Sequence, residues 1–200
     1  NTEERARGVI TASGGNHGAA LAYGAWRLGI PATIFLTAHA SADRVARVTM
    51  WGAQVRQHGQ VWDDAHAAAT EYAQTAGATY VHPFDADRTI AGQGTLGLEL
   101  LEDVPAVDCV LVAIGGGGLI AGMALAMKET RPGIRIIGVE PVGSAAMRYA
   151  LERGQVAPLP EVRTIADTLA PRAVSERTLS LTQRYVDEIV TVSDAQMVSA

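Results

Sequence analysis

Two glycine-rich stretches of the chain combine residue types that could bind a phosphorylated cofactor. The first is residues 11–18, TASGGNHG, which follows the apolar run GVI and precedes a helical pattern. The second is residues 114–119, IGGGGL, which follows the apolar run DCVLVA. Glycines let backbone N–H groups approach an anion, and a helix start adds partial positive charge. The second stretch therefore predicts a phosphate-binding turn, because one or two glycines would serve an ordinary connection.

The second stretch also fits a dinucleotide-binding pattern. Gly116, Gly118 and Ala121 match G-x-G-x-x-A, and Glu140 ends the next apolar run about 20 residues later. Taken alone, this pattern favours a nicotinamide-dependent oxidoreductase. It leaves the polar and glycine residues of 11–18 unexplained.

Short apolar runs alternate with helical patterns along the chain. This alternation predicts right-handed βαβ units and parallel sheets, in which ligands bind beyond the carboxyl ends of the strands. Both glycine-rich stretches lie at such ends. We expect strands at 8–12, 32–37, 53–58, 79–83, 108–114, 134–140 and 187–192, and helices at 16–28, 42–51, 63–76, 92–102, 118–130, 143–153 and 175–185.

The spacing of these elements predicts two open parallel-sheet α/β domains with flanking helices. After a leading segment at 1–7, we expect a domain over 8–86 and a second over 87–200. Ser193 with Gln196 forms a capping box that predicts a further helix near the end. Because the chain lacks an initiator Met and ends soon after this cap, we expect it to be a fragment, incomplete at both ends.

Composition excludes several classes of protein. Hydrophobic residues make up 48% of the 200, charged residues 18%, and the net charge is −5 without a basic run, so we expect no nucleic-acid partner. The apolar runs are shorter than the roughly 20 residues of a membrane span, and the charged start is no signal peptide. A cytoplasmic protein without a membrane partner is expected. The single cysteine, Cys109, is interpreted as packing within a buried strand.

Five motifs in order carry a resemblance to a known family. They are SGGNHG (13–18), AGQGTLGLELL (91–101), GGGGL (115–119), VEP (139–141) and TIAD (164–167). Together they resemble the threonine/serine dehydratase and serine racemase family of pyridoxal-phosphate (PLP) enzymes, fold type II, tryptophan synthase beta-like. The resemblance covers essentially the whole chain. It implies PLP as cofactor, a small domain followed by part of a large one, and a dimeric or tetrameric homo-oligomer.

The resemblance also implies roles for individual residues. Residues 13–17 match the loop that lies against the cofactor ring, and Asn16 matches the residue that hydrogen-bonds the ring's phenolic oxygen; the alternative for Asn16 is an ordinary helix N-cap. His17 is interpreted as a structural partner rather than an acid or base. The implied cofactor-binding residues are Ser13, Gly14, Gly15, Asn16, His17, Gly115, Gly116, Gly117, Gly118, Leu119 and Thr168.

Three positions depart from the family pattern. Gly14 stands where the racemase branch has a serine, which favours elimination over racemisation because a racemase needs a proton donor on each face of the ring. Thr168 stands where the family more often has glycine, so the identity of the substrate is left undetermined. Glu140 matches a cation ligand of some relatives, but Ala146 replaces their second carboxylate. We therefore expect no metal site, with Glu140 a weak candidate.

The catalytic lysine of the family lies upstream of the first motif, so we expect no catalytic residue within this chain. Lys128, the only lysine present, is predicted to lie on a solvated helix end and not to hold the cofactor. The implied activity is that of a lyase in amino-acid metabolism, a PLP-dependent threonine or serine dehydratase: elimination of a hydroxy amino acid to a 2-keto acid and ammonia. This fragment alone is expected to be inactive. A non-catalytic PLP-lyase-like binding module remains the third alternative.

Overall fold

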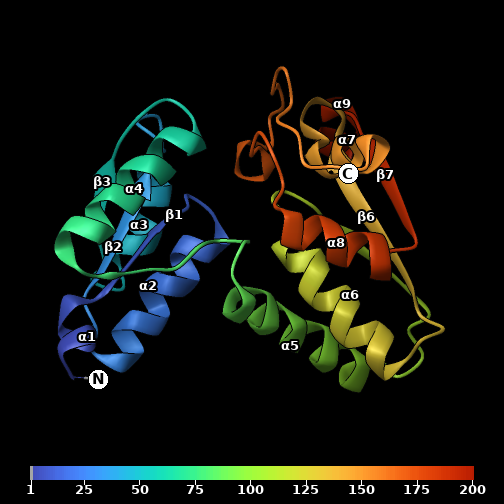
Figure 1. Cartoon of the computed structure of the whole chain (residues 1–200), viewed down its shortest axis with the longest axis horizontal. Helices are drawn as coiled ribbons and strands as arrows, with labels where there is room; N and C mark the ends of the chain where they lie inside the picture. Colours follow the sequence, from blue (N-terminus) through green and yellow to red (C-terminus); the bar gives the residue numbers. More distant parts are fainter. Residues whose placement is uncertain (1) are drawn as a thin grey trace. The chain divides into compact units, whose positions relative to one another are not determined.

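The computed structural model describes residues 2–200 as two compact units, which are described separately below (Figure 1). The first unit ends at Pro83, and the second runs from Phe84 to Ala200. The sequence had placed the division between residues 86 and 87.

The first unit is a parallel four-stranded sheet with helices on both faces. Its strand order is β3-β2-β1-β4. The alternation of side chains along β2 divides the core, because Ile34 and Leu36 pack with α2 and α3 while Phe35 packs with α4 on the other face. The elements are α1 (Thr2–Arg7), β1 (Val9–Ala12), α2 (Asn16–Leu28), β2 (Ala32–Leu36), α3 (Ala42–Thr49), β3 (Gln54–Gln57), α4 (Trp62–Ala76) and β4 (Thr79–Tyr80).

Helix α2 begins and ends at the residues expected from the sequence. It ends at Gly29, which takes the left-handed conformation (φ 62°) that a helix C-terminus commonly requires. At its start, Gly18 faces the carbonyl oxygen of Ser13 so closely that a Cβ would overlap it. The glycine therefore lets the strand turn directly into the helix.

The second unit contains a parallel three-stranded sheet in the order β5-β6-β7. Its core joins β5 and β6 to α6, α7 and α8. The elements are α5 (Asp87–Asp103), β5 (Cys109–Ala113), α6 (Gly118–Thr130), β6 (Arg135–Pro141), the 3-10 turns η1 (Val142–Ser144) and η2 (Asp167–Leu169), α7 (Ala146–Arg153), α8 (Glu176–Tyr185), β7 (Glu188–Val192) and α9 (Asp194–Ser199).

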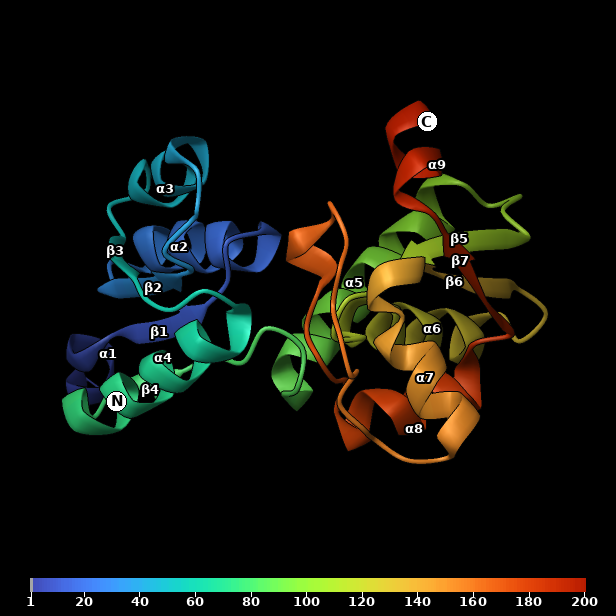
Figure 2. The ribbon, with the colours of Figure 1, turned by 90° about the horizontal axis from the view of Figure 1, so that it is seen from above.

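Helices α5 and α6 lie side by side in both ribbon views because glycines remove the side chains between them (Figures 1 and 2). A Cβ on Gly97 would lie 2.8 Å from Cγ of Met127, and a Cβ on Gly94 would lie 3.1 Å from the carbonyl oxygen of Gly122. A Cβ on Gly122 would overlap the carbonyl oxygen of Ile90. The motif at 91–101 is thus a helix-packing motif.

Several sequence expectations about elements need correction. Helix α5 begins at Asp87 rather than at residue 92, and β4 contains only Thr79 and Tyr80. The strand around Cys109 is buried on one side only, since Val110 and Val112 are buried while Leu111 is 66% exposed. The capping box at Ser193 is confirmed, because its hydroxyl accepts the N–H of Gln196 at the start of α9.

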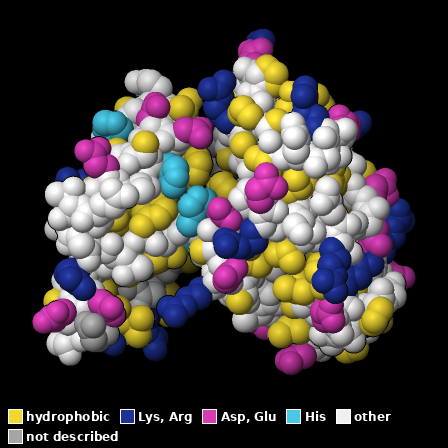
Figure 3. All heavy atoms as spheres, viewed as in Figure 1, with side chains coloured by type: hydrophobic (Ala, Val, Ile, Leu, Met, Phe, Trp, Pro, Cys, Tyr) yellow, Lys and Arg dark blue, Asp and Glu magenta, His cyan; other side chains and the backbone are white. Residues whose placement is uncertain are grey.

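No helix within residues 2–200 combines the length and apolar character that a membrane crossing requires. On the face seen in Figure 3, Lys and Arg side chains are interspersed with Asp and Glu side chains.

Candidate cofactor site

Residues 13–17 form a loop, here called the asparagine loop, between β1 and α2 of the first unit. Ser13 Oγ accepts the N–H of Gly15 at 3.3 Å, which tightens the turn. The N-cap of α2 is Gly15, not Asn16, so the alternative interpretation of Asn16 as a helix cap was wrong. The Asn16 carboxamide is exposed and makes no hydrogen bond to another residue within 2–200. Its amide is therefore available to a ligand.

His17 is tied to the residue that directly follows β4 of the same unit. Its Nε2 lies 3.3 Å from the carbonyl oxygen of Val81, to which it donates. Burial lowers the pKa of His17, and the bond to Val81 partly offsets this effect. The ring is thus held neutral in one orientation, as a structural partner would be. Thr11 donates its hydroxyl to the same Val81 oxygen at 2.7 Å.

Residues 115–118 form the second loop, here called the glycine loop, between β5 and α6. Gly117 has φ 89°, a conformation that favours glycine. Before the loop, Ile114 donates its N–H to Val139; after it, Ala121 donates to Gly117. The residues that lie between these two donors are 115–120, and their N–H groups have no acceptor among the described residues 2–200. Free N–H groups at a helix start are the donors that an anion requires.

The side chains around the glycine loop explain why four glycines occur in succession. A Cβ on Gly116 would overlap the ring of Phe84, and a Cβ on Gly118 would lie 2.8 Å from Cα of Phe84. On Gly117, a Cβ would lie 2.6 Å from Cε of Met147. Packing therefore requires glycine at these three positions, in addition to the access that glycine gives to the N–H groups.

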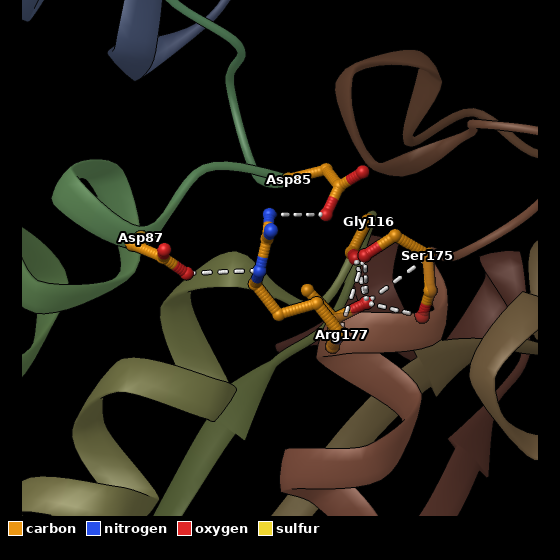
Figure 4. Close-up of polar contacts among 6 residues, drawn as sticks. Asp85, Asp87, Gly116, Ser175 and Arg177 are labelled. Carbon is orange, nitrogen blue, oxygen red and sulfur yellow. Dashed lines mark hydrogen bonds and ion pairs between the residues drawn. The ribbon is translucent and has the colours of Figure 1, made fainter.

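The loop is also held by a buried hydroxyl from α8. Thr178 is fully buried and donates Oγ1 to the carbonyl oxygen of Gly116 at 3.0 Å (Figure 4). Ser175 positions Thr178 by accepting its N–H at 3.1 Å. Sequence reasoning missed Phe84 and Thr178; the S-x-x-T spacing of residues 175–178 was the only local signal for the second.

Leu119 and Thr168 take different places beside this loop. Leu119 is half-buried and packs against the core of the second unit. Thr168 is an exposed residue of η2. The residue after it, Leu169, lies close to the loop: a Cβ built on Gly115 would be 3.2 Å from the Cα of Leu169. The segment carrying Thr168 thus borders the glycine loop.

Glu140 is a fully buried carboxylate that caps a helix. Its Oε1 accepts the N–H of Met147 at 2.8 Å, and its Oε2 accepts the N–H of Arg148 at 2.9 Å, both at the start of α7. Burial raises the pKa of Glu140 to about 7, against the lowering effect of these two bonds. Engaged in this way, Glu140 is not placed to hold the ribose that a dinucleotide-binding site needs.

Lys128 lies in the last turn of α6 and is paired. Its Nζ lies 2.8 Å from Oδ1 of Asp187, and the lysine side chain is 17% exposed. The prediction of a solvated lysine was therefore wrong in detail. The ion pair joins α6 to the residue before β7, where a lysine also complements the helix dipole.

A parallel α/β unit with an N–H-lined glycine loop after a strand is typical of proteins that bind phosphate groups. The chain belongs to the pyridoxal-phosphate dependent enzyme family, whose sequence model matches residues 1–200. It is a member of the threonine/serine dehydratase and serine racemase group with the type II fold, and the cofactor of this family is PLP.

Three relatives illustrate the similarity. The chain is 42% identical over 198 residues to an L-threonine ammonia-lyase of Geobacter sulfurreducens, covering 99% of the chain and 49% of the relative. It is 44% identical over 194 residues to a biosynthetic L-threonine dehydratase of Salmonella typhimurium, covering 96% and 38%. The structure of maize serine racemase matches with a TM-score of 0.92 at 38% identity, covering 100% and 60%. The chain thus spans about half or less of the length of the two threonine-cleaving relatives and 60% of the serine racemase chain.

Proposed function

We propose that the full-length protein is a PLP-dependent ammonia-lyase that converts threonine or serine into a 2-keto acid and ammonia. The observation that carries this proposal is the presence in one chain of two loops typical of this chemistry, each at the carboxyl end of a parallel strand. The identity to an L-threonine ammonia-lyase over nearly the whole chain supports the substrate class. When bound, PLP supplies the electron sink that makes the α-proton of an amino acid acidic.

The residues of the glycine loop fit the phosphate of this cofactor. Their free N–H groups would hold the phosphate, and a side chain on Gly116 or Gly118 would collide with Phe84. The exposed amide of Asn16 would donate to the phenolic oxygen of the ring. Ser13, Gly14, Gly15 and His17 would shape the loop around it, and Leu119 and Thr168 would border the phosphate and ring respectively.

Serine racemase activity is the second candidate, because a serine racemase structure matches the whole chain. Gly14 argues against it. Racemisation needs a proton donor on each face of the substrate carbon, and a glycine has no side-chain proton to deliver. Elimination needs one proton acceptor at that carbon.

The experiment is to supply the full-length protein with L-threonine and L-serine. We expect release of 2-keto acid and ammonia in equal amounts, a visible absorption band of bound PLP, and negligible D-amino acid by chiral chromatography. D-Serine formed as fast as pyruvate would overturn the assignment to elimination. A protein without the visible band or keto acid would support the non-catalytic alternative.

Action in the cytoplasm as a homo-oligomer, a dimer or tetramer, forms part of the same proposal. The mixed surface charge and the family membership support it. Size-exclusion chromatography with light scattering on the full-length protein measures the oligomeric state directly.

A further inference from the structure

The glycine loop lies between two segments of the second unit that are far apart in sequence. Phe84 lies against one side, where its ring meets Gly116 and its backbone meets Gly118. Thr178, at the start of α8, lies on the other side and bonds to the Gly116 carbonyl. The shape of the loop therefore depends on the separation between the segment 84–87 and the first turn of α8.

Arg177 joins these two segments. Its Nη1 lies 2.9 Å from Oδ1 of Asp85, and its Nε lies 2.9 Å from Oδ1 of Asp87. Figure 4 shows the guanidinium of Arg177 extending from α8 between the carboxylates of Asp85 and Asp87. Arg177 directly precedes Thr178, and Asp85 directly follows Phe84. The Arg177–Asp85 pair is thus one residue away from each contact that holds the loop, and Asp87 lies three residues after Phe84.

We propose that Arg177 is a positioning residue for the anion site, through a carboxylate clamp formed by Arg177, Asp85 and Asp87. This inference rests on the proposed function, since it assigns the glycine loop to an anionic group. The clamp keeps Phe84 and Thr178 at the spacing at which the N–H groups of residues 115–118 point to one anion.

The chemistry of arginine suits this role. A planar guanidinium presents several N–H donors in fixed directions, so one side chain can bind two carboxylates at once, whereas a lysine provides a single point of charge. Arg177 is 42% exposed, Asp85 38% and Asp87 85%. Pairs this exposed contribute little to the global free energy of unfolding. Their effect is expected on the local population of the binding-competent loop.

That population determines the apparent affinity for an anion. If the loop is in the competent shape for a fraction of the time, the apparent dissociation constant rises by the reciprocal of that fraction. Losing both exposed ion pairs should change the apparent dissociation constant for the anion by about two- to tenfold. Because the pairs are exposed, the change should shrink as salt screens them.

The test compares Arg177→Leu, Arg177→Lys and wild type in the full-length protein, freed of PLP, by amide hydrogen exchange of residues 115–118. The probe is inorganic phosphate. We expect Arg177→Leu to speed exchange of these amides and raise the phosphate concentration needed to protect them, by about two- to tenfold at low salt. Arg177→Lys should fall between, and the difference from wild type should narrow at 0.5 M salt.

Arg135→Gln is the matched control. It removes another exposed arginine–carboxylate pair of the same unit, Arg135 with Glu188 at 2.6 Å. Exchange and phosphate protection in Arg177→Leu equal to those of Arg135→Gln would overturn the proposal. So would equal acceleration in β5 and β6, which would indicate general destabilisation. The visible band of bound PLP tests the proposed function separately, because the phosphate measurement does not require it.

Discussion

Trp62 donates its indole N–H to the carbonyl oxygen of Ala12 at 2.9 Å. Ala12 is the last residue of β1 and directly precedes the asparagine loop. The indole ring is itself held in place, because it stacks on His66 with ring centroids 4.8 Å apart. His66 Nδ1 in turn lies 2.6 Å from the hydroxyl of Tyr80. A side chain of α4 thereby fixes the backbone at which the loop begins.

Replacing Trp62 by Phe should destabilise the first unit by about 1 kcal/mol, because the Ala12 carbonyl loses its donor while a ring remains to stack on His66. Urea denaturation followed by far-UV circular dichroism measures this. Trp51→Phe is the control, since the Trp51 ring contacts Tyr23 edge-on and Trp26 at a tilt and is not part of the Trp62–His66 stack. Equal destabilisation in both variants would show that ring size, not the hydrogen bond, accounts for the loss.

Replacing Asn16 by Ala should slow turnover of the full-length enzyme roughly 10- to 150-fold. A hydrogen bond to a charged oxygen contributes about 1.5–3 kcal/mol, and this is the rate loss if the whole contribution stabilises the transition state. The absorption maximum of bound PLP should shift as well. The melting temperature of the cofactor-free protein should not change, because the Asn16 side chain is exposed and bonds to no described residue. An unchanged spectrum with unchanged rates would remove Asn16 from the site.

Replacing Gly116 by Ala should destabilise the second unit by about 1–3 kcal/mol and weaken PLP binding, since the new methyl group must displace the Phe84 ring. Gly92→Ala is the control within α5 of the same unit, where a Cβ meets nothing within 4 Å. That change should be neutral or stabilising by up to about 1 kcal/mol, because alanine favours a helix interior. Thermal denaturation and PLP titration of the two variants separate these effects. Tight PLP binding by Gly116→Ala would contradict the assigned phosphate loop.

Glu140 should make the stability of the second unit depend on pH. Its pKa is about 7 when folded, above its ordinary value of 4.5, so the folded state binds this proton more tightly than the unfolded state does. The contribution is fully present below about pH 4.5 and is lost as pH rises to 7. The loss amounts to about 3 kcal/mol. The difference in unfolding free energy between wild type and Glu140→Gln should therefore fall by this amount between pH 4.5 and pH 8.

Urea titrations at several pH values provide the measurement for Glu140. They should be followed by far-UV circular dichroism, because Trp26, Trp51 and Trp62 all lie in the first unit and their fluorescence reports on that unit. A wild-type-to-variant difference that is constant with pH would show that the carboxyl group keeps its ordinary pKa.

Lys128 should not carry the cofactor. It lies ten residues beyond Gly118 on α6, about 15 Å along the axis, and is paired with Asp187. Borohydride reduction of the full-length holoenzyme followed by peptide mass spectrometry should find no pyridoxyl group on Lys128. The variant Lys128→Met should keep the visible band. An adduct on Lys128, together with loss of the band in this variant, would contradict the family assignment of both loops.

Local chemistry in the sequence was enough to predict the elements that begin or end at special residues. Helix α2 was expected at 16–28 and α6 at 118–130, and both are confirmed. The reason is that Gly29 ends α2 and the glycine loop begins α6 through backbone geometry that involves only neighbouring residues. The alternation of strands and helices likewise predicted parallel sheets. Two glycine-rich loops at carboxyl ends followed from that alternation alone.

Long-range packing decided the features for which no local pattern exists. Phe84 meets Gly116, Trp62 reaches Ala12, and Arg177 joins Asp85 to α8 only because folding brings distant segments together. The same reason explains the misjudged burial of Leu111, since an apolar residue in a strand is buried only where another layer covers its face. Residue types and spacing therefore predicted which backbone N–H groups would bind a phosphate, whereas tertiary contacts set the shape in which the chain presents these groups.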